Sequence, residues 1–152
     1  GLPANITVVG TESADALNAA VLAGKEGYKP PYIAGSEAIT FRTQTPTQFV
    51  RVYTAEQGGS GQVSSWMLNA ADIKGLSVEQ IASKYSLPQV PNMIADVNVP
   101  AGQMIRTSAA SDVQIKQGVA GNGGGSWVLF EVLVPEGAKI PPTWFSNPRS
   151  LP

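Results

Sequence analysis

Apolar and polar residues alternate over short runs along most of this chain, which is the pattern of β-strands with one buried face. The clearest run begins at Phe49: Arg51 and Tyr53 follow on the same side, and Val50 and Val52 alternate to the other. Further strands are predicted at 6–9, 38–42, 65–68, 93–99, 104–107 and 126–134.

Helical signals are confined to three short segments. An alanine-rich stretch at 13–23 follows residues that can cap a helix. Ser77 and Gln80 form a capping box, which opens a helix that Leu87–Pro88 ends, and 70–72 fit a single helical turn. The sequence therefore predicts an α+β fold: a small, curved, mainly antiparallel sheet with the N-terminal helix and a short helix packed on one side.

Length and composition predict one compact domain. The chain has 152 residues, 43% of them hydrophobic, which is enough for a single core. A proline-containing break at 27–32 separates an N-terminal helical entry region, 1–32, from the main domain, 33–152, which we expect to carry the function. The prolines of 141–152 predict an extended tail on the surface.

The absence of cysteine and histidine excludes several kinds of site. Disulfides, thiol nucleophiles, zinc fingers and imidazole bases are impossible, and we expect neither a metal nor a cofactor. The net charge is -1 and the 10 basic residues are scattered singly. A nucleic acid would therefore have to bind a patch that folding assembles.

No stretch of the sequence approaches the roughly 18 apolar residues of a membrane span, so we expect no stable membrane insertion. Residues 1–5 lack the pattern of a signal peptide. We expect the chain to be a piece cut from a longer protein.

Arg51 and Tyr53 stand out because a buried strand face rarely carries arginine. One interpretation is an ordinary face in solvent. The other is a cleft in which Arg51 holds an anion and the neighbouring phenol of Tyr53 stacks or transfers a proton.

Glu131 is unusual because it interrupts the apolar run at 127–134. In a central strand this carboxylate must be paired or must face a cleft. A carboxylate half-buried among apolar side chains has the surroundings of a general base. The alternative is an edge strand, with Glu131 in solvent.

A second polar cluster follows the strand predicted at 93–99. It contains Arg106, Thr107, Ser108 and, further along, Lys116. A binding role and the ordinary use of Thr and Ser as turn residues are both open.

The glycine run at 121–125 lacks the Lys-Ser/Thr of a phosphate-binding loop and precedes a strand rather than a helix. Its glycines would let the backbone approach a ligand, or would serve as a flexible connector. Trp66 and Trp127 fit the core, and Trp127 is also a candidate for substrate contact because it follows the glycines.

Several short motifs occur in a fixed order along the chain. They are GYKPPY at 27–32, FVRVY at 49–53, SWM at 65–67, DIKGL at 72–76, LP at 87–88, DVNVPAG at 96–102, the glycine run, and NPR at 147–149. In this order they resemble the C-terminal effector domains of contact-dependent growth inhibition exoproteins and related polymorphic toxins. The resemblance covers roughly residues 27–152.

The resemblance implies an antibacterial toxin. It would be secreted as the C-terminal part of a larger cell-surface exoprotein, delivered on contact, and act in the cytoplasm of the target cell. A cognate immunity protein would neutralise it in the producer. We expect that partner to be acidic and to cover Arg51, Arg106 and Lys116, with an inhibitor bound to the N-terminal helix or the tail as the alternative.

The toxins of this class have many activities, and we favour a metal-independent ribonuclease that cleaves transfer RNA. In that reaction Glu131 is the base, Arg51 and Arg106 bind phosphate, and Tyr53 or Lys116 is the acid. The other predicted substrate contacts are Thr107, Gly123, Gly124, Gly125 and Trp127.

The alternative is a toxin that consumes NAD, as an ADP-ribosyltransferase or an NAD glycohydrolase. Arg51, Ser64–Ser65 and Glu131 are similar to the Arg, Ser and Glu elements of ADP-ribosyltransferases. The glycine run is similar to that of NAD-hydrolysing toxin domains. The chain departs from the transferase pattern at Leu129, where transferases commonly have Gln or Glu, and from the pattern of the NAD-hydrolysing domains at 126–127, where those domains have Gln. A non-enzymatic binding module is the third possibility.

Overall fold

Two antiparallel sheets carry most of the regular structure. The computed structural model describes residues 3–13, 15–17, 19, 37–57, 61–85, 87, 89–108, 129–135 and 137–151. The five-stranded sheet has the order β1 (Ile6–Ser13), β2 (Glu37–Thr43), β6 (Met104–Ser108), β7 (Leu129–Leu133), β4 (Trp66–Met67). The three-stranded sheet has the order β3 (Thr47–Tyr53), β5 (Met93–Val99), β8 (Phe145–Ser150).

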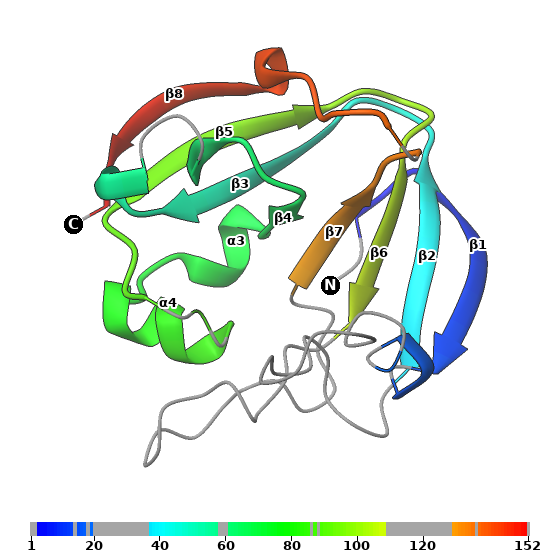
Figure 1. Ribbon diagram of the computed structural model, residues 1–152, viewed down its shortest axis with the longest axis horizontal. Coiled ribbons are helices and arrows are strands. Elements are labelled where there is room, and N and C mark those ends of the chain that lie inside the picture. Colours follow the sequence, from blue (N-terminus) through cyan, green and yellow to red (C-terminus); the bar gives the residue numbers. More distant parts are fainter. Residues whose placement is uncertain are drawn as a thin grey trace.

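The helices of the described residues are short (Figure 1). They include α3 (Ala70–Ile73), α4 (Val78–Lys84) and the 3₁₀ turns η1 (Ala55–Gln57) and η3 (Pro142–Trp144). The predicted mainly antiparallel α+β class is confirmed, with the strands divided between two sheets. In the described part of the chain, no helix is long and apolar enough to cross a membrane.

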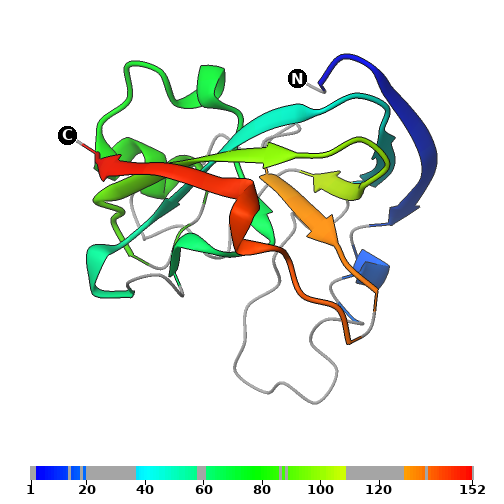
Figure 2. The same ribbon diagram turned by 90° about the horizontal axis from the view of Figure 1, so that it is seen from above.

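One bent ribbon of two chain segments links the sheets. β2 continues into β3 and β5 into β6, and the two segments run side by side across the bend (Figures 1 and 2). From the pair Thr47–Val99 to the pair Arg42–Met104 each segment advances by the same number of residues, so the bend inserts none. Each side chain therefore keeps its face of the ribbon through the bend.

Thr43 holds the corner of this ribbon. It is 1% exposed, and its Oγ1 donates to the carbonyl of Pro100 at 2.8 Å and accepts from the amide of Gln103 at 3.0 Å. Both capacities of the hydroxyl are used, which gives a hydrogen-bond partner to one carbonyl and one amide of the turn.

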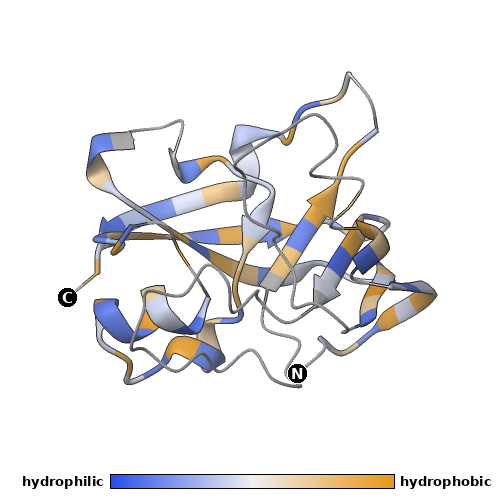
Figure 3. Cartoon of the chain, turned by 60° about the horizontal axis from the view of Figure 1, so that its bottom comes forward, coloured by the Kyte–Doolittle hydropathy of each residue, from blue (hydrophilic) through white to orange (hydrophobic). Residues whose placement is uncertain are grey.

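The odd-numbered residues of the ribbon form the main core. Hydrophobic and hydrophilic residues alternate along the strands (Figure 3). Phe49 of β3 and Phe130 of β7 meet with ring centroids 5.0 Å apart, so this core joins the two sheets. The other buried members are Phe41, Met67, Val97, Val99, Ile105, Val132 and Phe145.

The opposite face of the ribbon carries the helices. Val50 and Val52 pack with Ile73 of α3 and Ile81 of α4. At the other sheet, Ala38 packs with Leu17, and residues 15–17 and 19 are helical. The prediction that both helical elements lie on one side is therefore consistent with the register.

Local signals predicted several elements correctly. The amide of Gln80 donates to Ser77 Oγ at 3.1 Å and the amide of Ser77 donates to Gln80 Oε1 at 2.8 Å, so the capping box is confirmed. The strand predicted at 6–9 extends to Ser13, so the entry region also contributes an edge strand. Most of the helix predicted at 13–23 lies outside the described residues.

The tail predicted to lie extended on the surface at 141–152 is extended and mostly exposed over β8, and it is also part of a sheet. Phe145–Ser150 pairs with β5 as an edge strand, and Phe145 is buried in the main core. Pro148 is tolerated there because an edge strand has one row of backbone groups without a ladder partner. The sequence near 145–150 did not reveal this pairing, because the partner strand β5 lies about fifty residues earlier in the chain.

Candidate functional site

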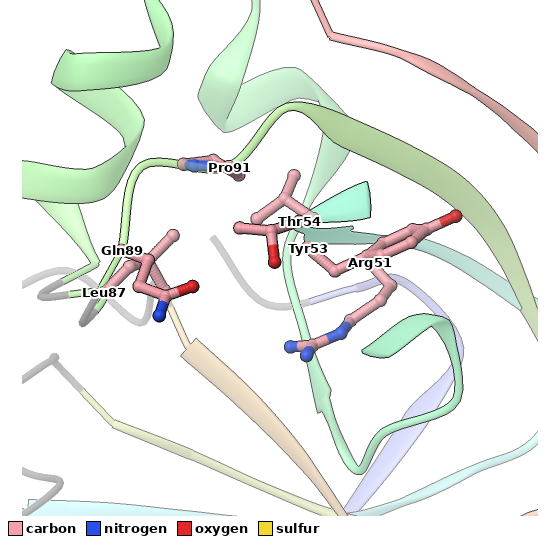
Figure 4. A pocket seen from close by; sticks show the side chains of 7 residues that line it. Arg51, Tyr53, Thr54, Leu87, Gln89 and Pro91 are labelled. Atoms are coloured by element: carbon pink, nitrogen blue, oxygen red, sulfur yellow. The ribbon is translucent and has the colours of Figure 1, made fainter. Parts of the chain in front are cut away.

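Arg51 lines a pocket at the edge of β3 (Figure 4). The hollow measures about 160 Å³ and takes in residues of β3 and of the segment between α4 and β5. The guanidinium of Arg51, the hydroxyl of Thr54 and the amide of Gln89 point into one space (Figure 4). Val52, Leu87 and Pro91 supply apolar walls.

The charge of Arg51 is half-buried and has no acidic partner among the described residues. Its Nε donates to the carbonyl of Gly61 at 2.9 Å, which fixes the direction of the side chain. Burial lowers the pKa of Arg51, and the nearby Tyr53 acts in the opposite direction. A desolvated cation without a carboxylate is costly unless an anion completes the site. The pocket therefore suits an anionic group such as a phosphate.

Tyr53 does not join Arg51 in this pocket through its hydroxyl. Its ring is buried at 6% exposure, and the phenolic oxygen points away from the guanidinium (Figure 4). The expected proton transfer from Tyr53 to a ligand held by Arg51 has no support in this arrangement. Alternation predicted the shared face of the two residues, but the rotation of each side chain depends on its packing.

Glu131 lies in the middle of the five-stranded sheet and is ion-paired. Arg106 is its direct neighbour on β6, and Trp66 is its neighbour on β4. Arg106 donates to Glu131 Oε1 from Nη2 at 2.9 Å and from Nε at 3.3 Å. The alternative of an edge strand with Glu131 in solvent is wrong, because β7 has a strand on each side.

One short segment, 61–66, connects Arg51 to the strand of Glu131. Its first residue accepts the hydrogen bond from Arg51, and the carbonyl of Ser65 accepts from the amide of Val132 at 2.8 Å. The Ser64 hydroxyl accepts from the amide of Trp66, which turns the segment into β4. Arg51, the Ser64–Ser65 pair and Glu131 thus lie on three successive neighbours, β3, the approach to β4, and β7.

The strands β3 and β4 are joined at a single place. Val50 and Leu68 form an isolated bridge with two hydrogen bonds of 2.8 Å, and among the described residues no further pair extends this ladder. The pocket of Arg51 begins beside this bridge, where the edge of β3 has no ladder partner in the described part of the chain. A ligand there can meet backbone as well as side chains.

Glu131 and Arg51 belong to different faces of their strands. By pairing and alternation, Glu131 shares its face with Trp66, Leu68 and Val50. Arg51 alternates to the other face, but its side chain runs along the strand edge toward Gly61. The pocket also includes Leu87, which packs on the helical side. The site therefore belongs to the strand edge rather than to one face of a sheet.

The prediction that Thr107 contacts substrate is contradicted by its burial. Its side chain is 0% exposed and, by alternation, lies on the opposite face of β6 from Arg106. Sequence adjacency suggested a cluster, but neighbouring residues in a strand point to opposite faces. Of the remaining predicted site residues, Lys116, Gly123, Gly124, Gly125 and Trp127 lie outside the described residues.

Thr54 and Gln89 are pocket residues that the sequence did not reveal. Both are polar residues beside a strand end or a proline, which is where ordinary turn residues also occur. The only available signal was their position near Arg51 and Pro91. The described residues contain no group of three or more acidic side chains that could hold a metal ion.

Comparison of the chain with protein-family models, with curated proteins and with solved structures found no match.

Proposed function

We propose that this domain is the toxic tip of a contact-dependent bacterial toxin and that it consumes NAD by breaking the bond between nicotinamide and ribose. One observation carries the proposal. Arg51, the Ser64–Ser65 segment and Glu131 follow one another on neighbouring strands. They are the residues whose order along the chain resembles the Arg, Ser and Glu elements of ADP-ribosyltransferases.

The chemistry suits these side chains. When the bond from ribose C1′ to nicotinamide breaks, nicotinamide leaves with the electron pair and the ribose develops oxocarbenium character. A fixed carboxylate such as Glu131 stabilises the positive charge. A guanidinium such as Arg51 binds the pyrophosphate. Water or an acceptor hydroxyl then adds to C1′ and releases a proton.

The distribution of basic residues favours a dinucleotide over RNA. Arg106 is paired with Glu131, Arg149 with Asp96, and Lys84 Nζ donates to the carbonyl of Asp72. Polyanion affinity grows with the number of phosphates that free cations contact. Arg51, half-buried in the pocket and without an acidic partner among the described residues, is matched to the two phosphates of NAD. The ribonuclease activity stays a prediction and forms the other arm of the test.

The test incubates the purified domain separately with NAD and with transfer RNA. We expect NAD to be lost with release of nicotinamide and transfer RNA to stay intact. Arg51→Ala and Glu131→Gln should each lower NAD consumption at least about 100-fold, as removal of one charge-stabilising group typically does. Lys139→Gln changes an exposed lysine outside the site and is the matched control.

Two results would contradict the proposal. Cleaved transfer RNA with intact NAD would support the ribonuclease. Inertness toward both substrates, from a folded domain that still arrests growth, would point to a binding module or to another activity.

A further inference from the structure

The guanidinium of Arg106 is engaged by a carboxylate of the protein, whereas a phosphate-binding arginine would direct its guanidinium at the substrate. The side chain of Arg106 is 16% exposed and that of Glu131 is 20% exposed, so both charges are largely withdrawn from solvent. Two nitrogens of one guanidinium, Nη2 and Nε, converge on the same oxygen, Oε1. The fork of Arg106 is thus directed at the carboxylate.

The backbone beneath this pair is fixed on both sides. β7 is held between β6 and β4, and Arg106, Glu131 and Trp66 stand in one row across the three strands. Two hydrogen bonds to one oxygen, made from a planar and rigid fork, set the rotation of the carboxylate about its last side-chain bond. The oxygen that Arg106 does not hold is consequently given a defined direction.

Stability alone is a weak reason for this pair. Withdrawing two charges from water costs free energy that their attraction only roughly offsets, and apolar residues of similar size often do as well. A charged pair in the middle of a sheet is therefore better explained by what its carboxylate does.

We infer that Arg106 is a positioning residue that holds the Glu131 carboxylate in the orientation needed to stabilise the ribosyl cation, and that it does not bind the phosphates of the substrate. This role rests on the proposed function. It assigns the two arginines different tasks: Arg51 binds the anion and Arg106 orients the reactive carboxylate.

The experiment separates binding from turnover in Arg106→Gln. We expect the kcat for NAD to fall about 10- to 100-fold, as misplacement of a reacting group by about 1 Å does, while the Kd for NAD stays within about twofold of wild type. Arg51→Ala is the reference for a phosphate ligand and should raise the Kd. Arg106→Lys keeps the charge but loses the fork, so its kcat should also be low.

A double variant shows whether Arg106 acts through Glu131. If it does, Arg106→Gln should slow the residual turnover of Glu131→Gln no further, because the carboxylate it positions is already absent. A raised Kd in Arg106→Gln would overturn the inference in favour of a phosphate ligand. A lowered Tm with an unchanged kcat in Arg106→Gln would show that the Arg106–Glu131 pair is only a structural contact.

The failure of the proposed function gives a different result. Wild-type protein that leaves NAD intact rejects the function and, with it, this role of Arg106. Wild-type protein that consumes NAD, with an Arg106→Gln variant altered only in Kd or only in Tm, rejects the inference alone.

Discussion

Arg51 and Tyr85 are two side chains whose polar groups are buried without the partners that such groups usually have. Arg51 is held only through Nε, by the carbonyl of Gly61, among the interactions of the described residues. The hydroxyl of Tyr85 and Oδ2 of Asp72 have no hydrogen-bond partner in the same part of the chain. Unsatisfied polar groups reduce stability, so each residue is open to a test that separates stability from function.

Replacement of Arg51 by Met keeps an unbranched apolar stem and removes the charge. We expect the free energy of unfolding to stay within about 1 kcal/mol of wild type or to rise, because the lost hydrogen bond is offset by removal of a desolvated cation. NAD consumption should be abolished. Denaturant unfolding and an NAD assay on the same preparation check both parts, and a large loss of stability would make Arg51 a structural residue.

Tyr85→Phe should change the response of stability to high pH. Burial raises the pKa of the Tyr85 phenol, and the Asp72 carboxylate raises it further. The unfolded chain therefore releases the phenol proton first, so the stability that the neutral phenol contributes is present below roughly pH 10 and is lost as the pH rises further.

At pH 7 we expect Tyr85→Phe to be as stable as wild type to within about 1 kcal/mol, since the hydroxyl has no partner among the described residues. Above roughly pH 10 the variant should lose stability less steeply than wild type, by up to about 1.4 kcal/mol per pH unit. Chemical unfolding from pH 7 to 11 measures the difference. Parallel curves would mean that the phenol ionises in the folded protein as it does in the unfolded chain.

At the scale of elements, the bend of the ribbon places the site. The segments β2–β3 and β5–β6 keep one register through the bend, so β3 enters one sheet while β2 and β6 stay in the other. The pocket edge of β3 and the strand of Glu131 are brought near each other by this bend and by the Val50–Leu68 bridge. The corner at Thr43 is consequently a point where stability and site geometry depend on the same hydrogen bonds.

Thr43→Val tests that corner with a side chain of nearly the same shape. It removes the hydroxyl that bonds Pro100 and Gln103 and leaves both backbone groups without this partner. We expect a loss of about 1–3 kcal/mol. Thr47→Val, which removes one hydroxyl bond to the neighbouring carbonyl of Thr45, is the matched control and should lose less. Equal losses in the free energy of unfolding would show that the hydrogen bonds of Thr43 contribute no more to stability than the bond of Thr47.

At the scale of the whole molecule, the nearly neutral net charge of -1 and the half-buried Arg51 of the pocket determine which groups an inhibitor should present. The charge of Arg106 is already offset by Glu131. We therefore expect an acidic immunity protein to present a carboxylate to Arg51 in preference to Arg106.

Expressed inside bacteria, the domain should arrest growth and deplete NAD, and a small protein encoded directly downstream should relieve both. Arg51→Met should be harmless at the same expression level. In the complex we expect Arg51 to be covered by an interface of at least about 1,200 Å² in total. A structure of the complex in which the pocket of Arg51 stays open would reject this mode of inhibition, and harmless expression of wild type would reject the toxin.

The sequence by itself determined the elements whose causes are local. The capping box at Ser77 and Gln80, the turn after Val99 and the alternation along 49–53 depend on residues within one turn or one strand, and all are present. It also made Glu131 a residue that had to be paired or to face a cleft if its strand was central, because burial of an unpaired carboxylate is costly.

Only the tertiary structure decided which distant groups meet. Pairing of β6 with β7 made Arg106 the partner of Glu131, and Thr107 was buried on the other face of β6. Pairing of β8 with β5 turned a proline-containing tail into a strand. Strand order and register follow from how all the apolar faces share one core, and no short segment of the sequence contains that information.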